Sequence, residues 1–306
     1  MLPSPHQSWA HSTCTVAELT KAIQDDSITA IESDILMGTD TSSSSTSSKQ
    51  PIMAHPPERT SDLSFTTFME MTSSCNKHLK LDIKEKECIP PILTTLKKEN
   101  TKDAMIYFNA DILPGPGVRG TVPIPPPAFL QPCLEFLETQ PPQTAQSHYA
   151  FSLGWRTDCR SIYGYTPQDI SKMEEVMLQY SLLEKSAGVV LAVNARVLAK
   201  SPSVLDDTLG EFGKTQKLQV LIWTGTGEPP ISNRIFSNLK DHFERIGCQD
   251  LVGFDCQVAS NPWMGAIFDV GVKTNGVWWN TKKAFWYTVE LILPKMNVVQ
   301  KLLKRD

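Results

Sequence analysis

The sequence lacks the short motifs that identify many enzyme classes at once. Neither GxSxG nor HExxH occurs, which argues against a serine-hydrolase elbow and a zinc-protease helix. No run of 18 apolar residues is present, so no transmembrane helix is predicted. Residues 1–10 contain no basic segment followed by an apolar stretch, so we expect no secretory signal peptide. Together these absences predict a cytoplasmic location.

The pattern of cysteines and the net charge also argue against several classes of protein. The seven cysteines are an odd number without any CxxC pair, which argues against a disulfide scaffold or a zinc ribbon. We expect reduced thiols that act as small buried hydrophobes. Lys and Arg number 29 against 33 Asp and Glu, giving a net charge of −4. We therefore expect no nucleic-acid partner.

What is present is a globular composition in which apolar runs alternate with helical periods. The chain is 41% hydrophobic and 20% charged. Candidate strands are 8–12, 29–36, 51–54, 79–84, 105–113, 149–155, 188–198, 217–224 and 251–258. Candidate helices are 15–25, 64–73, 90–99, 127–138, 167–185, 203–212 and 232–246. Without the short piece 51–54, eight strands remain, which predicts an α/β fold of the TIM (β/α)8 barrel type. A doubly wound sheet is the competing prediction.

Two segments differ from the rest in composition. A flexible Ser/Thr-rich loop is expected at 39–50 within a barrel domain spanning 1–262. The remaining residues, 263–306, form a divergent C-terminal extension with four of the seven tryptophans and a net positive charge. Trp278 and Trp279 with nearby lysines predict either peripheral contact with an anionic membrane or packing of this extension on the barrel.

Polar side chains recur at alternate positions on four candidate strands. Because side chains two apart share one face of a strand, each group points into the barrel, and its later members reach the carboxyl-end rim where barrel active sites form. The groups are Glu32 with Asp34, Lys80 with Asp82 and Lys84, Asn109 with Asp111, and Asn194 with Arg196. We expect the last two pairs to contact substrate.

These groups predict a metal site with acid–base chemistry beside it. Carboxylates packed together repel one another, and a divalent cation removes that repulsion. Glu32, Asp34 and Asp82 offer only hard oxygen ligands, which favours Mg²⁺ or Ca²⁺. His11 and His55 lie near these strands, and two imidazoles can serve as general acid and general base. With Lys84 to neutralise a phosphate, the set suits displacement at a phosphodiester.

Six ordered motifs resemble one known family. They are Trp9-Ala-His, Ile31-Glu-Ser-Asp34, Met53-Ala-His-Pro-Pro57, Leu79-Lys-Leu-Asp-Ile-Lys84, Phe108-Asn-Ala-Asp-Ile-Leu-Pro-Gly-Pro116 and Ser152-Leu-Gly-Trp155. Together they resemble the menorin family, which includes the "family with sequence similarity 151" proteins. That family is similar in turn to the phospholipase-C-like phosphodiesterases, which include glycerophosphodiester phosphodiesterases and sphingomyelinase D enzymes.

The resemblance implies roles for several of the matching residues. Glu32, Asp34 and Asp82 correspond to the metal ligands of the superfamily, and His11 and His55 to its acid–base pair. The resemblance further implies that Lys84 contacts phosphate and that Trp155 is an aromatic residue at the rim near the substrate. The implied protein is a metal-dependent hydrolase or lyase acting on a glycerophosphodiester or a lysophospholipid-like headgroup.

One departure from the superfamily pattern leaves the substrate open, and a second function is open as well. Glycerophosphodiesterases usually carry His-Arg-Gly at the first histidine, whereas this chain reads His11-Ser-Thr and lacks that arginine. The alternative is a catalytically silent barrel that serves as an interaction or signalling module.

Overall fold

The strands form one curved sheet, and the helices lie outside it. The structure is a computed structural model that describes residues 2–42, 49–98, 104–225 and 227–260. Eight strands make a nearly closed barrel in which each strand is hydrogen-bonded in parallel to the next. In order they are β1 (Trp9–Ala10), β2 (Ala30–Asp40), β5 (His78–Ile83), β6 (Ile106–Pro114), β7 (Tyr149–Arg156), β8 (Val189–Asn194), β9 (Leu218–Trp223) and β10 (Val252–Asp255).

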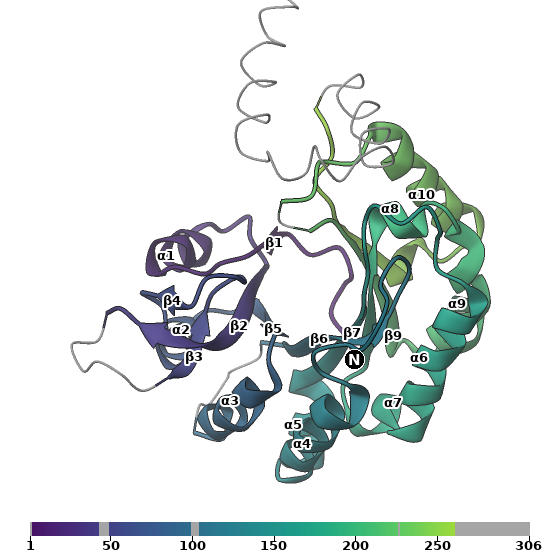
Figure 1. Cartoon of the computed structure of the whole chain (residues 1–306). Coiled ribbons are helices and arrows are strands. Elements are labelled where there is room, and N and C mark those ends of the chain that lie inside the picture. Colours follow the sequence, from purple (N-terminus) through teal and green to yellow (C-terminus); the bar gives the residue numbers. More distant parts are fainter. Residues whose placement is uncertain (1, 43–48, 99–103, 226, 261–306) are drawn as a thin grey trace, which may run out of the picture.

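Helices connect successive strands and surround the sheet (Figure 1). They are α1 (Val16–Gln24), α2 (Phe65–Thr72), α3 (Ile89–Leu96), α4 (Pro126–Glu138), α5 (Pro142–His148), α6 (Pro167–Gln179), α7 (Leu182–Lys185), α8 (Ala195–Leu198), α9 (Asp206–Phe212) and α10 (Asn233–Arg245). Short 3₁₀ turns occur at Lys86–Cys88, Pro202–Leu205, Gly213–Thr215 and Gln249–Leu251. Two further strands, β3 (Gln50–Met53) and β4 (Thr60–Ser61), pair with the distal part of β2.

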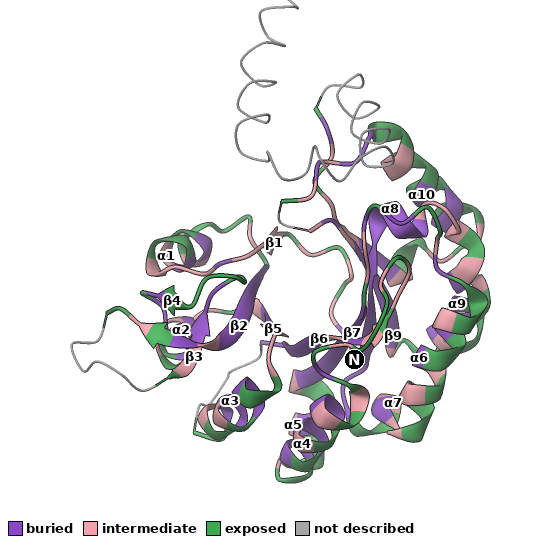
Figure 2. Ribbon diagram, viewed as in Figure 1, coloured by how far each residue is buried: buried purple, intermediate pink, exposed green. Residues whose placement is uncertain are grey.

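Most of the barrel strands, such as β2 and β8, are buried on both faces, as expected for parallel strands covered by helices (Figure 2). On β2, Ile31 and Ile35 are fully buried in the apolar cluster that the helices share. Their neighbours Glu32 and Asp34 line a cavity inside the barrel. Burying the isoleucines against the helices therefore directs these two carboxylates into the barrel.

The structure confirms the α/β barrel with parallel strands and does not have the strand order of a doubly wound sheet. Two predicted elements were too long. The strand predicted over 188–198 ends at Asn194, because the Asn194 side chain accepts hydrogen bonds from the backbone N–H groups of Arg196 and Val197 and caps α8. The helix predicted over 167–185 is interrupted at Ser181, which adopts a left-handed conformation (φ 51°).

Parts of the predicted domain plan fall outside the described residues. In the predicted loop 39–50, β2 continues to Asp40 and β3 begins at Gln50, whereas 43–48 lie outside the described residues. The predicted extension 263–306 also lies outside them, with Trp278 and Trp279. Among the helices that the structure describes, none combines the length and apolar character needed to cross a bilayer.

Candidate functional site

The register of three strands sets the predicted polar residues side by side. Asp34 on β2 is paired with Asp82 on β5, and Asp82 with Asn109 on β6. Paired residues on parallel strands direct their side chains to the same face. A cavity of about 260 Å³ opens on that face, and these three residues line it. The cavity also holds His11, Glu32, His55, Lys84 and Asp111, so it unites eight predicted site residues.

Three carboxylates converge in this cavity. Glu32, Asp34 and Asp82 each place one oxygen so that all three oxygens lie within 4.8 Å of one another. Glu32 and Asp34 are only 2% and 4% exposed. Buried carboxylates this close repel unless a cation lies among them. Their donor atoms are all hard oxygens, so this set fits a divalent cation such as Mg²⁺ or Ca²⁺.

The ammonium group of Lys84 also lies among these carboxylates. Its Nζ atom is 2.7 Å from Asp34 and 2.6 Å from Asp82. Burial raises the pKa of Asp34 to about 6, although the charge of Lys84 opposes that shift. For Asp82, burial would also raise the pKa, but the charge and hydrogen bond of Lys84 hold it below its usual range. Burial alone would lower the pKa of Lys84, and the two carboxylates raise it instead.

His11 follows β1, the first strand of the barrel, and contacts Asp255 on β10, the last strand. Its Nδ1 atom is 3.0 Å from Asp255, just at the end of β10, and 3.4 Å from Glu32. Burial would lower the pKa of His11, but the hydrogen bond to Asp255 and the charge of Glu32 raise it above its usual value. The next residue, Ser12, has a left-handed conformation (φ 54°), and its backbone N–H donates to Glu32 at 2.7 Å. Glu32 therefore holds the turn and attracts the imidazole, which Asp255 holds by a hydrogen bond.

His55 reaches the same cavity from the end of β3. It follows β3, whose antiparallel pairing with β2 continues in a hydrogen bond from the backbone N–H of Ala54 to the carbonyl of Asp34 at 2.9 Å. Its Nδ1 atom is 2.7 Å from the carbonyl oxygen of Pro56. His55 is exposed, whereas His11 is partly buried. The two imidazoles thus line one cavity with different access to solvent.

Asp111 adds a fourth carboxylate to the cavity wall. It is paired with Gly154 on β7, and a Cβ atom at Gly154 would collide with the Asp111 carboxylate. Glycine is therefore required for this close approach. Burial, together with the charge of Asp82, raises the pKa of Asp111 to about 6.

Three predicted site residues do not line the cavity. Trp155 is only 1% exposed and packs edge-on against Tyr165, with ring centroids 5.3 Å apart, so it is a core residue and not a rim aromatic. Asn194 is fully buried and caps α8. Arg196 lies on α8 and lines a different cavity. The end of β8 at Asn194 explains the last difference, because Arg196 does not continue along a strand face.

The cavity also contains residues that the sequence-based site did not include. Lys80, Trp223 and Glu228 line it, and Asp255 joins it through His11. Lys80 shares a strand face with Asp82, a period-two signal that pointed to it. Asp255 follows an apolar stretch in the last predicted strand. A carboxylate at that position of a strand was the sequence feature that could have identified it as a site residue. Glu228 lies in a loop, where strand periodicity gives no information.

Comparison with known proteins places the site inside a recognised domain. Residues 6–246 match the model of a protein family described as "Menorin N-terminal domain". The human protein FAM151B is 31% identical over 247 residues, which cover 78% of this chain and 79% of that relative. The profile match includes every cavity residue from His11 to Glu228, whereas Asp255 lies beyond its end.

Proposed function

The chain belongs to the menorin family, and on that premise we propose that its acidic cavity is the active site of a metal-dependent phosphodiesterase of the phospholipase-C-like type. The observation that carries this proposal is the convergence of three carboxylates, two histidines and a lysine in one cavity of about 260 Å³. The proposed substrate is a glycerophosphodiester or a lysophospholipid-like phosphodiester, and the reaction is hydrolysis or intramolecular displacement.

Glu32, Asp34 and Asp82 are the residues that would hold Mg²⁺ or Ca²⁺. Such a cation, when bound, supplies polarisation of the phosphoryl oxygens. Lys84 lies against two of the three carboxylates, so its ammonium group is near enough to contact an anionic oxygen of a substrate held there. Its positive charge would neutralise the phosphate.

The two histidines would divide the proton transfers. One takes the proton from the attacking water or from a neighbouring hydroxyl of the substrate, and the other gives a proton to the leaving oxygen. Attack by water yields a phosphomonoester, and attack by the substrate hydroxyl yields a cyclic phosphate. Asp255 and Glu32 orient the His11 ring, while exposed His55 can exchange its proton with solvent.

Single and double substitutions of the histidines test this proposal. We expect His11→Ala and His55→Ala each to lower turnover of a lysophospholipid or glycerophosphodiester by about 10²–10⁴-fold in the presence of Mg²⁺. His6→Ala is the matched control, because His6 does not line the cavity. Thermal unfolding of each variant verifies that the fold is intact. Wild-type turnover in the His11→Ala/His55→Ala protein would contradict the proposal.

One observation favours the second candidate, a silent barrel that acts as an interaction module. Lys84 already neutralises the Asp34 and Asp82 carboxylates, so the acidic cluster can be stable without an ion. Binding of a metal ion without turnover of lysophospholipids, glycerophosphodiesters or cyclic phosphates would support this candidate.

A further inference from the structure

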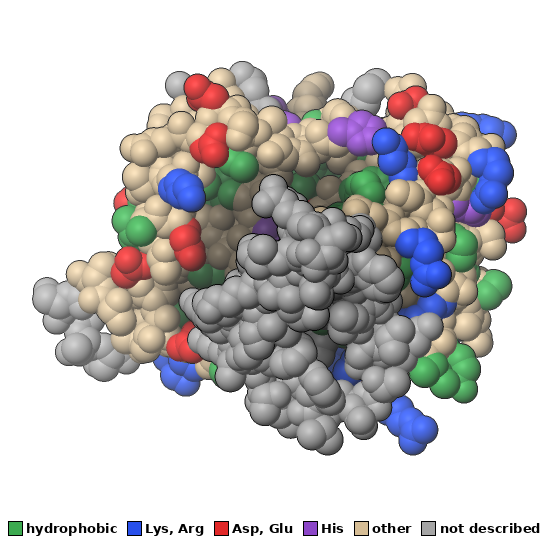
Figure 3. Space-filling view, turned by 90° about the horizontal axis from the view of Figure 1, so that it is seen from above, with side chains coloured by type: hydrophobic (Ala, Val, Ile, Leu, Met, Phe, Trp, Pro, Cys, Tyr) green, Lys and Arg blue, Asp and Glu red, His purple; other side chains and the backbone are tan. Residues whose placement is uncertain are grey.

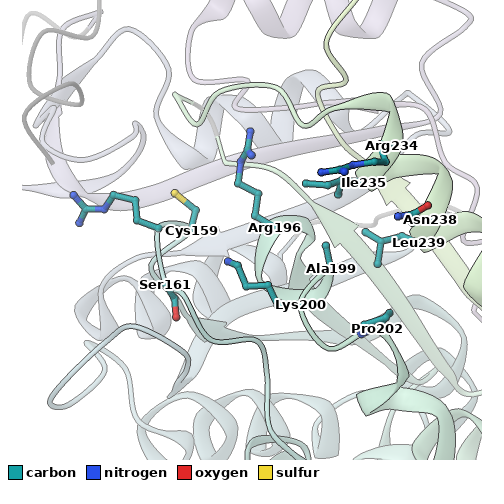
Figure 4. A pocket seen from close by; sticks show the side chains of 11 residues that line it. Cys159, Ser161, Arg196, Ala199, Lys200, Pro202, Arg234, Ile235, Asn238 and Leu239 are labelled. Atoms are coloured by element: carbon teal, nitrogen blue, oxygen red, sulfur yellow. The ribbon is translucent and has the colours of Figure 1, made fainter. Parts of the chain in front are cut away.

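A second cavity adjoins the proposed active site at the same end of the barrel. Its volume is about 290 Å³, and it is formed by the loop after β7, by α8 and by the first half of α10 (Figure 4). The segment from Glu228 to Pro230 separates the two cavities. Glu228 lines the acidic cavity, and Arg196 of the second cavity donates to the carbonyl oxygens of Pro229 and Pro230, each at 2.8 Å. The two cavities therefore share a wall.

The second cavity has the opposite charge to the first. Its lining contains Arg160, Arg196, Lys200 and Arg234, and no carboxylate is among the described residues that line it. Arg234 is exposed and extends from α10 toward Arg196 (Figure 4). In Figure 3, Lys and Arg side chains are more numerous on the right, the side on which α9 and α10 lie in Figure 1, and some Asp and Glu side chains lie among them. Guanidinium groups bind phosphate well because their donors match its oxygens.

An exposed apolar pair begins at the edge of this cavity. Ile162 and Tyr163 are 67% and 70% exposed, and they directly follow Ser161, which lines the cavity. Hydrogen bonds hold their loop in place. Ser161 Oγ donates to the carbonyl of Tyr163 at 2.9 Å, and the Ser161 N–H donates to the carbonyl of Asp158 at 2.8 Å. The pair is thus displayed by an ordered turn, so little conformational freedom is lost when it is buried.

We propose that this face docks on an anionic phospholipid surface, with Ile162 and Tyr163 in the interfacial layer and a headgroup phosphate in the basic cavity. A lipid–water interface is the partner that offers apolar contact and negative charge side by side. Arg160, although paired with Asp158 at 2.8 Å, and Arg234 supply the exposed positive charge at this face. Docking brings the adjoining acidic cavity to the membrane surface. The binding itself requires neither a metal ion nor turnover, so it goes beyond the proposed chemistry.

Vesicle co-sedimentation of the full chain tests the docking. We expect more binding to phosphatidylcholine vesicles that contain phosphatidylserine than to pure phosphatidylcholine, and less at high salt. Ile162→Ser/Tyr163→Ser should weaken binding about tenfold through lost apolar burial. Arg234→Glu should weaken it about fivefold or more, the effect of a basic side chain near an anionic surface.

Two matched variants control for general effects of these changes. Leu178→Ser removes another exposed apolar side chain, 62% exposed, near the end of α6. Lys98→Glu reverses an exposed charge just after α3, on the other side of the barrel from α10 (Figure 1). Both should bind vesicles as the wild type does.

Several results would overturn the docking. One is equal vesicle binding by the wild type and by both test variants. The same result is expected if residues 261–306 alone attach the chain to the vesicle. Another is binding of inorganic phosphate without binding of vesicles. Asp34→Asn/Asp82→Asn should keep wild-type vesicle binding, and turnover of a soluble glycerophosphodiester is measured separately. Failure of docking is thereby distinguished from failure of the proposed chemistry.

Discussion

The ammonium group of Lys84 lies 2.7 Å from a carboxylate oxygen of Asp34. This pair joins a proposed phosphate-binding residue to a proposed metal ligand. Lys84 also lies 2.6 Å from Asp82, so one lysine neutralises two of the three converging carboxylates. A metal ion bound by these carboxylates would have to share them with the ammonium group, which makes Lys84 a competitor for the site as well as a partner for substrate.

The carboxylates of Asp34 and Asp82 should therefore strengthen metal binding, whereas Lys84 should weaken it. Calorimetric titration of metal-stripped wild type with Mg²⁺ and Ca²⁺ should show saturable binding that Asp34→Asn/Asp82→Asn lacks. Lys84→Met should bind the ion several-fold more tightly, because a competing cation is removed. Asp241→Asn/Asp250→Asn, which changes two exposed carboxylates, is the control. No binding to folded wild type would leave the silent barrel as the leading candidate.

The stability of the Lys84→Met protein should become dependent on metal. The substitution removes the lysine from a partly buried cluster of ion pairs and leaves the carboxylates uncompensated. Without metal, we expect this to lower the free energy of unfolding by about 2 kcal/mol. Saturating Mg²⁺ should restore part of this loss, because a ligand that binds only the folded state stabilises it. Urea unfolding with and without Mg²⁺ measures both effects. A variant as stable as wild type in metal-free buffer would show that Lys84 does not compensate the cluster.

The parts of the site that the sequence predicted well come from strand periodicity. Alternation on β2 and β5 was sufficient to place Asp34 and Asp82 inside the barrel, because isoleucine and leucine side chains occupy the opposite faces. The coarse barrel follows from a different pattern, the succession of eight predicted strands with helical segments between most of them. The pairing of neighbouring strands then brings the residues together.

The parts that could not be predicted depend on contacts between distant segments. Asp255 meets His11 across 244 residues of sequence, a contact set by the near closure of the barrel. Trp155 is buried because Tyr165 packs on it, and its local motif contains no sign of that neighbour. Arg196 was misplaced because an asparagine can either continue a strand or cap a helix, and the capping hydrogen bonds of Asn194 decide between them.

The contact between His11 and Asp255 predicts a measurable change in protonation. Asp255→Asn removes the charge and weakens the hydrogen bond that raise the pKa of His11, so burial should dominate and the His11 pKa should fall. A raised histidine pKa in the folded state contributes stability that is present at low pH and lost as pH rises through that pKa. The substitution should therefore cost more stability at pH 5 than at pH 8. NMR titration of the His11 ring measures the shift, with His6 as the control resonance, and an unchanged His11 titration would contradict the assignment.

Asp111 should destabilise the fold as pH rises. Its pKa is raised from 3.8 to about 6 by burial and by the charge of Asp82, so the folded state binds a proton more tightly than the unfolded state does. Stability then decreases as pH rises from about 4 to about 6 and stays lower above that range. Asp111→Asn keeps the shape of the side chain and removes this ionisation. It should raise the free energy of unfolding at pH 8 by on the order of 2 kcal/mol and leave it little changed at pH 4. Urea unfolding at both pH values, with Asp241→Asn as an exposed control, decides the point. An equal effect of Asp111→Asn at pH 4 and pH 8 would mean that the carboxyl is not the source of the pH dependence.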